Sequence, residues 1–511
     1  MLPRLNIDVK ERICQIAHAH QLNVQDAGVL SDLRQIQFAN LTFTLTHVDS
    51  QWRRVAMRYA WHTVYVDDCL PNDIFHSIHT VYARYTRKLC VMVRFRGIVS
   101  HYRRYSMTHE NADLQPFCHL HMWPQLEELD ITYAHKCGFP GLASYIEPRL
   151  CNVRKLTVRG RLPIDMRRAV LFLNSPKLKE MHVRAFLRDD DSLSTISNYG
   201  DPILLMPIAS SLSTITLTTA IDVRIIRAVL DRGRQQLKKV ALIGLCPAQL
   251  VATGVTRAFT DLVEKRERVW SSLKMLNIKI CMHLLGNAPA KVYLNATEFP
   301  SLECLKITDC SSAISVSDHP LSVVYGQSFS KTWLRLRYLY IMALSDHDSM
   351  LVSQYMPYLA KLDVQSMQIL KPECLMTALG LWHLLTSALP LSAIRLTCLG
   401  QETPEDSAEN VSDEQSLLDF DAVRTNHPAR VLVVPNIRLT QLQIESIRQR
   451  CKCLSSLAVA SSDYSVDCVP SSCSKACQEP PPLLIQSMTY LASTTPPYRR
   501  MVRIMNLWGG N

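Results

Sequence analysis

At 511 residues the chain is too long for one ordinary compact core, so we expect several domains or a repeat array. Its composition, 47% hydrophobic and 20% charged, is that of a folded protein, and a net charge of +11 does not by itself indicate nucleic-acid binding at this length. Charges stand where a secretory signal would have its apolar core, and no run approaches the roughly 18 apolar residues of a membrane span. We therefore predict an intracellular protein of the cytoplasm, the nucleus or both, without a membrane partner.

The first helix is predicted in the segment IDVKERICQIAHAHQ, near the start of the chain. Val9, Ile13 and Ile16 recur at i, i+4 and i+7, which is the spacing of one helix face. Asp8 is the expected N-cap, and Glu11 three residues later completes a capping box. These residues predict an amphipathic helix that begins after Asp8.

A second helical region is predicted in residues 40–66. Four of its apolar residues share one helix face: Leu41, Leu45, Val48 and Trp52. A helix cap is expected at Ser50, and the alternation of Val64 with Val66 predicts a first strand. We therefore predict a small helical module, the head, over residues 1–66.

Residues 82–105 interleave seven Arg or Lys residues with four tyrosines and Phe95. Basic and aromatic residues together are typical of proteins that bind single-stranded nucleic acid. The same segment contains KLCVMVRF, which alternates as a strand does and would place Arg94 and Arg96 on its outer face. The strand is the favoured interpretation, and nucleic acid is not an expected partner.

One apolar motif, Leu/Val-x-x-Leu/Ile/Val/Met-x-Ile/Leu/Val, returns through the rest of the chain. In WPQLEELDI (123–131) and FPSLECLKI (299–307) an aromatic residue and a proline precede it. Its last two apolar positions are two residues apart, as on one face of a strand, and its return at intervals indicates a repeat architecture. Eleven copies of this repeat motif begin at Leu126, Val153, Leu178, Leu212, Leu237, Leu273, Leu302, Leu336, Leu359, Leu391 and Leu454.

Segments with helical spacing separate the copies, in residues 162–176 and 221–233. In the second segment one helix face is marked by Ile221, Ile225, Val229 and Leu230. A strand, a helix and a further strand within about 30 residues require parallel strands joined by crossover connections. A single unit cannot bury its own apolar face, so neighbouring units stack into a curved solenoid. We predict an α/β solenoid with parallel inner strands and outer helices over residues 67–465. An α/β protein with a leucine-rich parallel sheet is the alternative.

The strand residues that alternate with the buried ones would face the inner, concave side of such a solenoid. Tyr and Arg are the residue types most often found as anchors of protein interfaces. The candidates for binding a target are therefore Arg159, Arg184, Tyr338 and Tyr340.

Two segments depart from the period. Residues 401–425 are acidic and polar and are expected to form a surface insertion, while residues 466–511 contain QEPPPLL and STTPPYRR, which are typical of a loosely ordered tail. In a reducing compartment most of the 17 cysteines are expected as small buried apolar residues, and their spacing predicts no metal site. The sequence carries no nucleophile, phosphate-binding or zinc-protease motif, so we predict no catalytic residue and no cofactor.

The repeat motif resembles that of the leucine-rich-repeat family, in particular its irregular, long-period members. Cys281 and Cys310 hold the position where that family has Asn or Cys. The head resembles an F-box, which opens Leu-Pro-x-Asp-Val-x-x-x-Ile and closes Val-Ser-x-x-Trp-Arg-x-x-Ala…Trp. Asn6 and Asp49 replace the proline and the serine of that pattern. The matching residues are Leu5, Asp8, Val9, Ile13, Val48, Trp52, Arg53, Ala56 and Trp61.

The resemblance implies that the head docks on the Skp-type adaptor of a cullin–RING ubiquitin ligase while the repeats present a protein substrate. The residues implied in adaptor binding are Leu5, Val9, Ile13, Leu41, Leu45, Val48 and Trp52. The expected function is that of a non-enzymatic substrate-recognition subunit. Two alternatives remain open: an interaction scaffold outside the ligase whose head only caps the solenoid, and an RNA-binding solenoid that uses residues 82–105 and the basic inner strands.

Overall fold

A computed structural model of the chain describes the head and the repeat array in part. The described residues are 6–26, 44–67, 82–93, 123–133, 152–160, 176–185, 209–218, 223–245, 269–280, 294, 296–309, 332–341, 344–367, 376–399 and 418–461. All of them belong to a unit that spans Met1–Cys468, and a second unit spans Val469–Asn511. The predicted tail, residues 466–511, lies outside the described residues.

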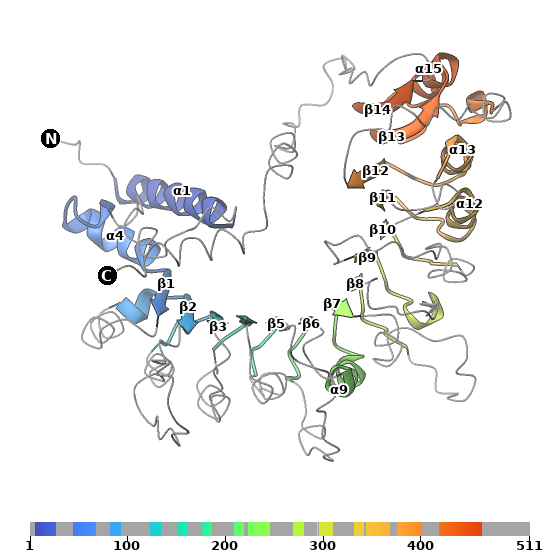
Figure 1. Ribbon diagram of the computed structural model, residues 1–511. Coiled ribbons are helices and arrows are strands. Elements are labelled where there is room, and N and C mark those ends of the chain that lie inside the picture. Colours follow the sequence, from blue (N-terminus) through green and yellow to red (C-terminus); the bar gives the residue numbers. More distant parts are fainter. Residues whose placement is uncertain are drawn as a thin grey trace, which may run out of the picture. The chain divides into compact units, whose positions relative to one another are not determined.

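Fourteen strands of the described residues form one parallel sheet, in which the strand order follows the chain order (Figure 1). Parallel neighbours require a crossover connection between each strand and the next. The predicted α/β class with parallel strands is therefore confirmed. The strands are β1 (Thr63–Asp67), β2 (Lys88–Val93), β3 (Glu128–Tyr133), β4 (Lys155–Gly160), β5 (Glu180–Ala185), β6 (Thr214–Thr218), β7 (Lys239–Leu245), β8 (Met275–Ile280), β9 (Cys304–Asp309), β10 (Tyr338–Ile341), β11 (Lys361–Met367), β12 (Ala393–Leu399), β13 (Val431–Leu439) and β14 (Ser456–Ser461).

The repeat motif sets where the strands begin and which of their faces is buried. Each of the eleven copies begins two residues before a strand, and the first residue of each copy is at most 8% exposed. Leu129 pairs in register with Leu156, and Leu276 pairs with Leu305. These four side chains are each at most 1% exposed. The leucines of successive strands thus share one core, as the sequence predicts.

Backbone hydrogen bonds fix the register at the start of each strand. The N–H groups of Glu127 and Glu128 both donate to the carbonyl oxygen of Arg87, at 2.8 and 2.9 Å. The same pair of bonds recurs between all other neighbouring strands from β1 to β14. Because a shift by one residue would turn every leucine to the opposite face, this repeated pair holds the apolar face in place.

Three strands lack a leucine or valine at the first position of the motif. Trp61 precedes β1, Thr86 precedes β2 and Ala429 precedes β13, and all three residues are buried. The Thr86 hydroxyl donates to the carbonyl oxygen of Tyr82 at 3.3 Å, which satisfies its polar group in this apolar position. The predicted strands at Val64 and in KLCVMVRF are confirmed as β1 and β2, although residues 94–105 lie outside the described residues. The motif does not predict β13, because Ala429 replaces the leucine.

The aromatic residue ahead of the motif is part of the core. Trp270, Phe299 and Trp333 each stand three residues before a motif leucine and are 1–2% exposed. Their rings stack, with centroids 6.4 Å apart between Trp270 and Phe299 and 6.5 Å apart between Phe299 and Trp333. The aromatic position therefore links successive repeats, which explains why the sequence returns to it.

Helices connect some of the strands and lie on one side of the sheet (Figure 1). The predicted helix in residues 221–233 is confirmed as α9, whose side chains Ile226, Val229 and Leu230 are fully buried. The other predicted helix, residues 162–176, lies outside the described residues. The α-helices of the described array are α9 (Val223–Gly233), α12 (Asp346–Tyr355), α13 (Ala378–Thr386) and α15 (Gln441–Arg450).

A carboxylate of one repeat caps the helix of the next repeat. Asp346, in the first turn of α12, accepts the N–H groups of Thr377 and Gly380 at 2.8 Å each and the Thr377 hydroxyl at 2.7 Å. These groups belong to the N-terminus of α13, where a negative charge is favourable. A β-carbon on Gly380 would lie 2.5 Å from the Asp346 carboxylate, so only glycine allows this close approach.

The end of the predicted acidic insertion belongs to the packed array. In residues 401–425 the part from 418 onward contains the short 3-10 helix η9 (Phe420–Ala422), and Phe420 and Val423 are 2% and 1% exposed. The prediction of a surface insertion is therefore wrong for residues 418–425, because the side chains of Phe420 and Val423 enter the core. Residues 401–417 lie outside the described residues.

Candidate functional site

The described residues of the head form two packed helices, α1 (Ile7–Asp26) and α4 (Ser50–Ala60). Their common core contains Cys14, Trp52, Val55 and Ala56, all at most 6% exposed. The predicted helices are therefore present.

In both helices the N-cap residue lies earlier in the chain than the predicted one. The side-chain oxygen of Asn6, not Asp8, caps α1 by accepting the Asp8 N–H at 3.3 Å. Asp49, not Ser50, caps α4 by accepting the Trp52 N–H at 2.8 Å. Both predictions are wrong because each helix begins earlier than its pattern suggests, and the residue before its first turn takes the capping role.

A buried lysine holds the two helices of the head together. The Lys10 side chain is 3% exposed, and its ammonium group donates to Gln51 Oε1 at 2.8 Å and lies 3.8 Å from Asp49 Oδ2. The same group lies 5.5 Å from the centre of the Trp52 ring. Because a buried charge needs partners, the face of α1 that carries Lys10 and Cys14 is the one that meets α4.

Part of the apolar stripe predicted on α1 lies at the surface. Val9 is 45% exposed and Ile16 is 58% exposed, while Ile13 is half-buried against the head core. Val48, in the turn before α4, is 43% exposed. Exposed apolar side chains at the junction of two packed helices are typical of a surface that meets another protein.

The remaining head residues implied in adaptor binding have different environments. Trp52 is 6% exposed and Leu45 is half-buried, so both support the packing of the head itself. The turn at residues 46–48 separates Leu45 and Val48 from α4, so the continuous helix face predicted with Trp52 is wrong. Leu5 and Leu41 lie outside the described residues.

The inner face of the sheet is formed by the strand residues that alternate with the buried ones, such as Glu128 and Asp130 beside Leu129 and Ile131. On β2 to β5 its first row is a ladder of alternating charge, formed in register by Lys88, Glu128, Lys155 and Glu180. The Lys155 ammonium lies 4.0 Å from the Glu180 carboxylate. Opposite charges on neighbouring strands stabilise the sheet modestly, so this ladder is balanced within the protein.

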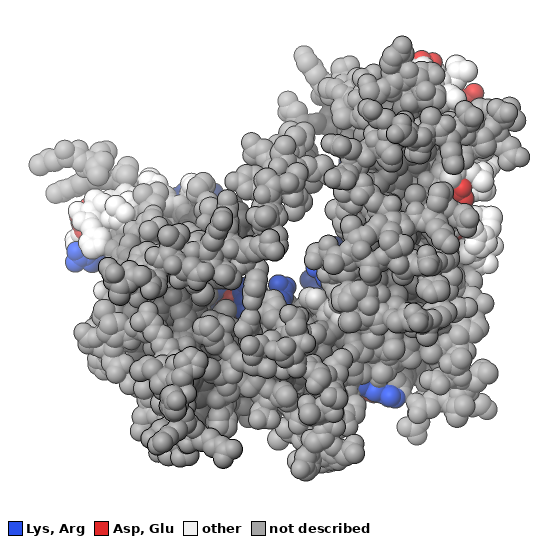
Figure 2. Space-filling view, viewed as in Figure 1, with Lys and Arg blue, Asp and Glu red and all other residues white. Residues whose placement is uncertain are grey.

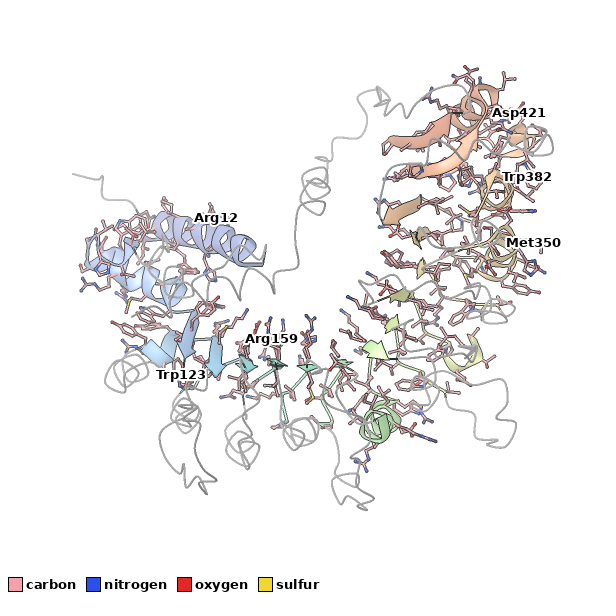
Figure 3. All side chains as sticks on the ribbon, in the orientation of Figure 1. Arg12, Trp123, Arg159, Met350, Trp382 and Asp421 are labelled. Atoms are coloured by element: carbon pink, nitrogen blue, oxygen red, sulfur yellow. The ribbon has the colours of Figure 1, made fainter. Side chains whose placement is uncertain are left out.

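Arg159, a predicted anchor, belongs to this balanced region. Its guanidinium forms an ion pair with Asp130 on the neighbouring strand, with 3.2 Å between Nε and Oδ1. Figure 3 labels Arg159 among the side chains on the inner side of the sheet. His182 also has local partners, because its Nδ1 lies 2.9 Å from the Thr216 hydroxyl and its Nε2 lies 3.7 Å from Glu180. Burial and then the nearby Lys155 charge lower the pKa of His182 from its ordinary value, which favours a neutral ring.

The inner face of β5 to β9 carries cations without acidic partners. Arg184, Lys239, Lys279 and Lys306 occupy inner positions of β5, β7, β8 and β9, and none of them forms an ion pair with another described residue. Lys and Arg side chains are visible at the centre of the space-filling view (Figure 2). We call these four residues the cationic patch. In the described part of the sheet, no Asp or Glu lies on the inner face between Glu180 of β5 and Asp363 of β11.

The two predicted tyrosine anchors lie together at one end of the cationic patch. The Tyr338 hydroxyl donates to Asp363 Oδ2 at 2.6 Å, and the Lys306 ammonium lies 5.2 and 6.0 Å from the centres of the Tyr338 and Tyr340 rings. Burial and the Asp363 carboxylate raise the pKa of both tyrosines. The Tyr338 hydroxyl is therefore a protonated donor already used by Asp363, while Lys306 is held by the rings.

The sequence places the predicted anchors on the inner face but does not show which of them already have an acidic partner. Arg159 and Arg184 are neighbours in register, but Arg159 forms an ion pair with Asp130, whereas Arg184 forms none with any described residue. Lys239, Lys279 and Lys306 were not among the predicted residues, although they occupy equivalent alternate positions after their motif leucines. Their place at alternate strand positions could have identified these lysines from the sequence, because every strand repeats the same pattern.

Other chemistry finds little support in the described residues. They contain no group of three or more His, Cys, Asp or Glu side chains arranged to hold a metal ion. Burial raises the pKa of the Cys90 thiol to about 12 and that of Cys451 to about 11, which disfavours a reactive thiolate. No helix within the described ranges has both the length and the apolar character needed to cross a bilayer.

A shallow cavity of about 200 Å³ lies where β2 to β5 begin, away from the predicted anchors. Its walls include Arg87, Glu127, Arg154 and Lys177. The Arg87 guanidinium lies 3.7 Å from the Glu127 carboxylate, and Lys177 donates to Asn152 at 2.8 Å, so two of the three cations already have partners.

Comparison of the sequence with models of protein families and with curated proteins gave no match in either case.

Proposed function

We propose that this chain is a non-catalytic substrate-recognition subunit of a cullin–RING ubiquitin ligase. The head would bind the Skp-type adaptor in the manner of an F-box, and an irregular leucine-rich-repeat array would hold the target on its inner face. The chain would act by placing the target near the ubiquitin-conjugating partner, so its contribution would be one of proximity. The observation that carries this proposal is the apolar stripe that stays exposed on an otherwise packed head.

The geometry of the head supports docking. Val9 and Val48 are the chain neighbours of Lys10 and Asp49, whose charged groups approach each other, so both lie at the same junction of α1 with the start of α4. The buried Lys10 side chain and its partners Gln51 and Asp49 hold this junction, and the apolar residues beside it are left at the surface. An apolar stripe on a fixed helix pair is suited to packing against the helices of a partner.

The repeat array supports the binding of a target. It supplies one strand per repeat and leaves the inner face free of the helices α9, α12, α13 and α15 (Figure 1). A long row of equivalent strand positions offers side chains of different chemistry at a regular spacing of about 4.8 Å. Such a surface can bind an extended segment or a folded partner without any catalytic group.

The test is binding of the full chain to a purified Skp-type adaptor. We expect the wild type to bind, and Val9→Asp combined with Val48→Asp to weaken binding by roughly 100-fold, because each change buries a charge in the apolar contact. Trp52→Ala is not a suitable variant, since the buried Trp52 side chain supports the head core.

The matched control is Leu334→Asp combined with Leu442→Asp. These leucines are 66% and 77% exposed and lie far along the chain from the head. The control should bind the adaptor as the wild type does, and circular dichroism should show that both double variants are folded. A folded wild type that does not bind the adaptor, or equal loss in both double variants, would reject the proposal.

The second candidate function is an interaction scaffold whose head only caps the array. Its support is that Ala60 and Trp61 at the end of α4 join the core of the array, and that the Trp61 and Tyr82 rings stack with centroids 3.8 Å apart. A repeat stack needs a cap at its end, and this packing provides one. The adaptor-binding experiment separates the two candidates, because a cap has no need of Val9 and Val48 at the surface.

A further inference from the structure

We propose that the cationic patch, Arg184, Lys239, Lys279 and Lys306, binds a short anionic segment of the target polypeptide. The ligand would carry aspartate, glutamate or phosphorylated side chains, which share the chemistry that these cations recognise. This inference rests on the proposed function, because it names the class of target that the inner face would hold.

The first argument is the contrast in charge pairing along one continuous sheet. On β2 to β5 each inner-face acid has a basic residue on a neighbouring strand: Glu128 and Glu180 each lie in register with Lys155, and Asp130 forms an ion pair with Arg159. On β6 to β10 the described inner face has three lysines and no acid. Cations that lack internal partners are those that remain available to a ligand of opposite charge.

The second argument is the size of the patch. Arg184 on β5 and Lys306 on β9 are separated by four strand spacings, which correspond to about 19 Å. An extended peptide covers that distance with roughly six residues, at about 3.3 Å per residue. The four cations also occupy different rows, since Lys239 is at the first inner position of its strand, Lys306 at the second, and Arg184 and Lys279 at the third.

The third argument is that one cation is held in place. Lys306 has its ammonium over the rings of Tyr338 and Tyr340, and Tyr338 is itself fixed by its hydrogen bond to Asp363. A lysine that is already ordered loses less side-chain entropy when it binds an anion. Lys306 is therefore the cation best prepared for a charged ligand.

The flanks of the patch favour a peptide over a nucleic acid. Glu180 stands on one side and Asp363 on the other, so a long phosphate backbone would meet acidic groups beyond the patch. The tyrosine rings are occupied by the Lys306 ammonium and are less available for stacking with bases. A segment with a few acidic residues fits the space between these flanks.

The experiment measures binding of the full-length protein to labelled peptides at low salt. The probes are a peptide with several glutamates, the same peptide with phosphoserines in their place, the same peptide with glutamines, and a single-stranded RNA of similar length. We expect both anionic peptides to bind and the glutamine peptide not to bind. The variant is Arg184→Gln, Lys239→Gln, Lys279→Gln and Lys306→Gln combined, and we expect it to weaken peptide binding roughly 100-fold, since each exposed charged contact contributes about two- to fivefold.

The matched control replaces four exposed cations that lie outside the inner face: Arg54→Gln, Arg424→Gln, Arg448→Gln and Lys452→Gln. It removes the same net charge, so it reports the part of the binding that depends on overall attraction alone. We expect it to change the affinity by no more than about twofold. Equal weakening in the two quadruple variants would overturn the proposal.

Two further outcomes would also overturn it. One is equal binding of the glutamate and glutamine peptides by the wild type, and the other is tighter binding of the RNA than of either anionic peptide through the same four cations. Adaptor binding by the same quadruple variant separates this inference from the proposed function, because the head is unchanged. If the wild type binds the anionic peptides but not the adaptor, the proposal of an anionic ligand stands and the proposed ligase role is rejected. If it binds the adaptor but not the anionic peptides, the ligase role stands and the anionic ligand is rejected.

Discussion

The inner faces of β2–β5 and of β6–β10 belong to the same sheet but use charge in different ways. In the first region Lys88, Glu128, Lys155 and Glu180 alternate in register, and Arg159 pairs with Asp130. In the second region the charged inner-face residues of the described strands are all lysines. The difference teaches that strand position alone does not identify a binding residue. The neighbour across the sheet decides whether a charge is already balanced.

The largest expected effects are losses of stability caused by truncating leucines in the core that β2–β5 and β6–β10 share. Leu129→Ala under the balanced region and Leu305→Ala under the cationic patch should each lower the free energy of unfolding by about 3 kcal/mol, since both leucines are fully enclosed. Urea unfolding measures the loss, with the exposed Leu442→Ala as control, for which we expect a change below about 0.5 kcal/mol. A negligible effect at one of the two sites would show that the regions do not share one core.

We expect the loss of stability at acid pH to come from a buried histidine and not from the charged residues of the inner face. His427, before β13, is fully buried, its Nδ1 accepts the Ala429 N–H at 3.2 Å, and burial together with Arg424 lowers its pKa to about 4. The unfolded chain binds this proton below about pH 6.5 while the folded chain does not. Stability is therefore complete above that pH and falls as the pH drops toward 4, by on the order of 2 kcal/mol at pH 5.

The variant His427→Asn retains a hydrogen-bond acceptor without the titrating ring. We expect its free energy of unfolding to change less between pH 7 and pH 5 than that of the wild type. Thermal unfolding at the two pH values gives the comparison. An unchanged pH dependence would assign the acid sensitivity to other groups, such as His18, whose pKa burial also lowers to about 4.

Removing the acids of the balanced region should extend the cationic patch. In the triple variant Glu128→Gln, Asp130→Asn and Glu180→Gln, Lys155, Arg159 and their neighbours lose their counter-charges. We expect binding of the glutamate peptide to tighten up to roughly tenfold, while the stability changes by no more than about 1 kcal/mol, because surface ion pairs contribute little. Fluorescence titration measures the affinity.

A control for the triple variant is Glu127→Gln, Asp421→Asn and Glu445→Gln, which removes three acids from outside the inner face. Its affinity for the peptide should rise by less than about twofold. If both triple variants tighten binding to the same extent, net charge alone governs the interaction and the contrast between the two regions has no functional meaning.

The smallest expected effect separates two arginines that the sequence predicts as equals. Arg184→Gln should weaken binding of the glutamate peptide by roughly threefold, whereas Arg159→Gln should leave it nearly unchanged because Asp130 already neutralises that guanidinium. The two residues are neighbours in register, so each is the control for the other. Equal effects would mean that the Asp130 ion pair opens when the ligand binds.

The sequence by itself determined the strand positions other than that of β13, the buried face and the parallel order of the array. These properties follow from local periodicity: apolar residues two apart select one face of a strand, and the return of the motif makes each unit bury the next. Leu129, Leu156, Leu276 and Leu305 are paired in the sheet as their repeat positions require. The alternation also placed Arg159, Arg184, Tyr338 and Tyr340 on the inner face.

Only the tertiary structure decided which face of α1 is buried and which inner-face charges are paired. On α1 the periodicity of Val9, Ile13 and Ile16 is real, yet the face with Lys10 and Cys14 packs against α4, because Gln51 and Asp49 supply partners for the lysine. On the sheet, Arg159 pairs with Asp130 of the neighbouring strand, whereas Arg184 forms no ion pair with a described residue. Such contacts join positions far apart in the chain, and local patterns contain no information about them.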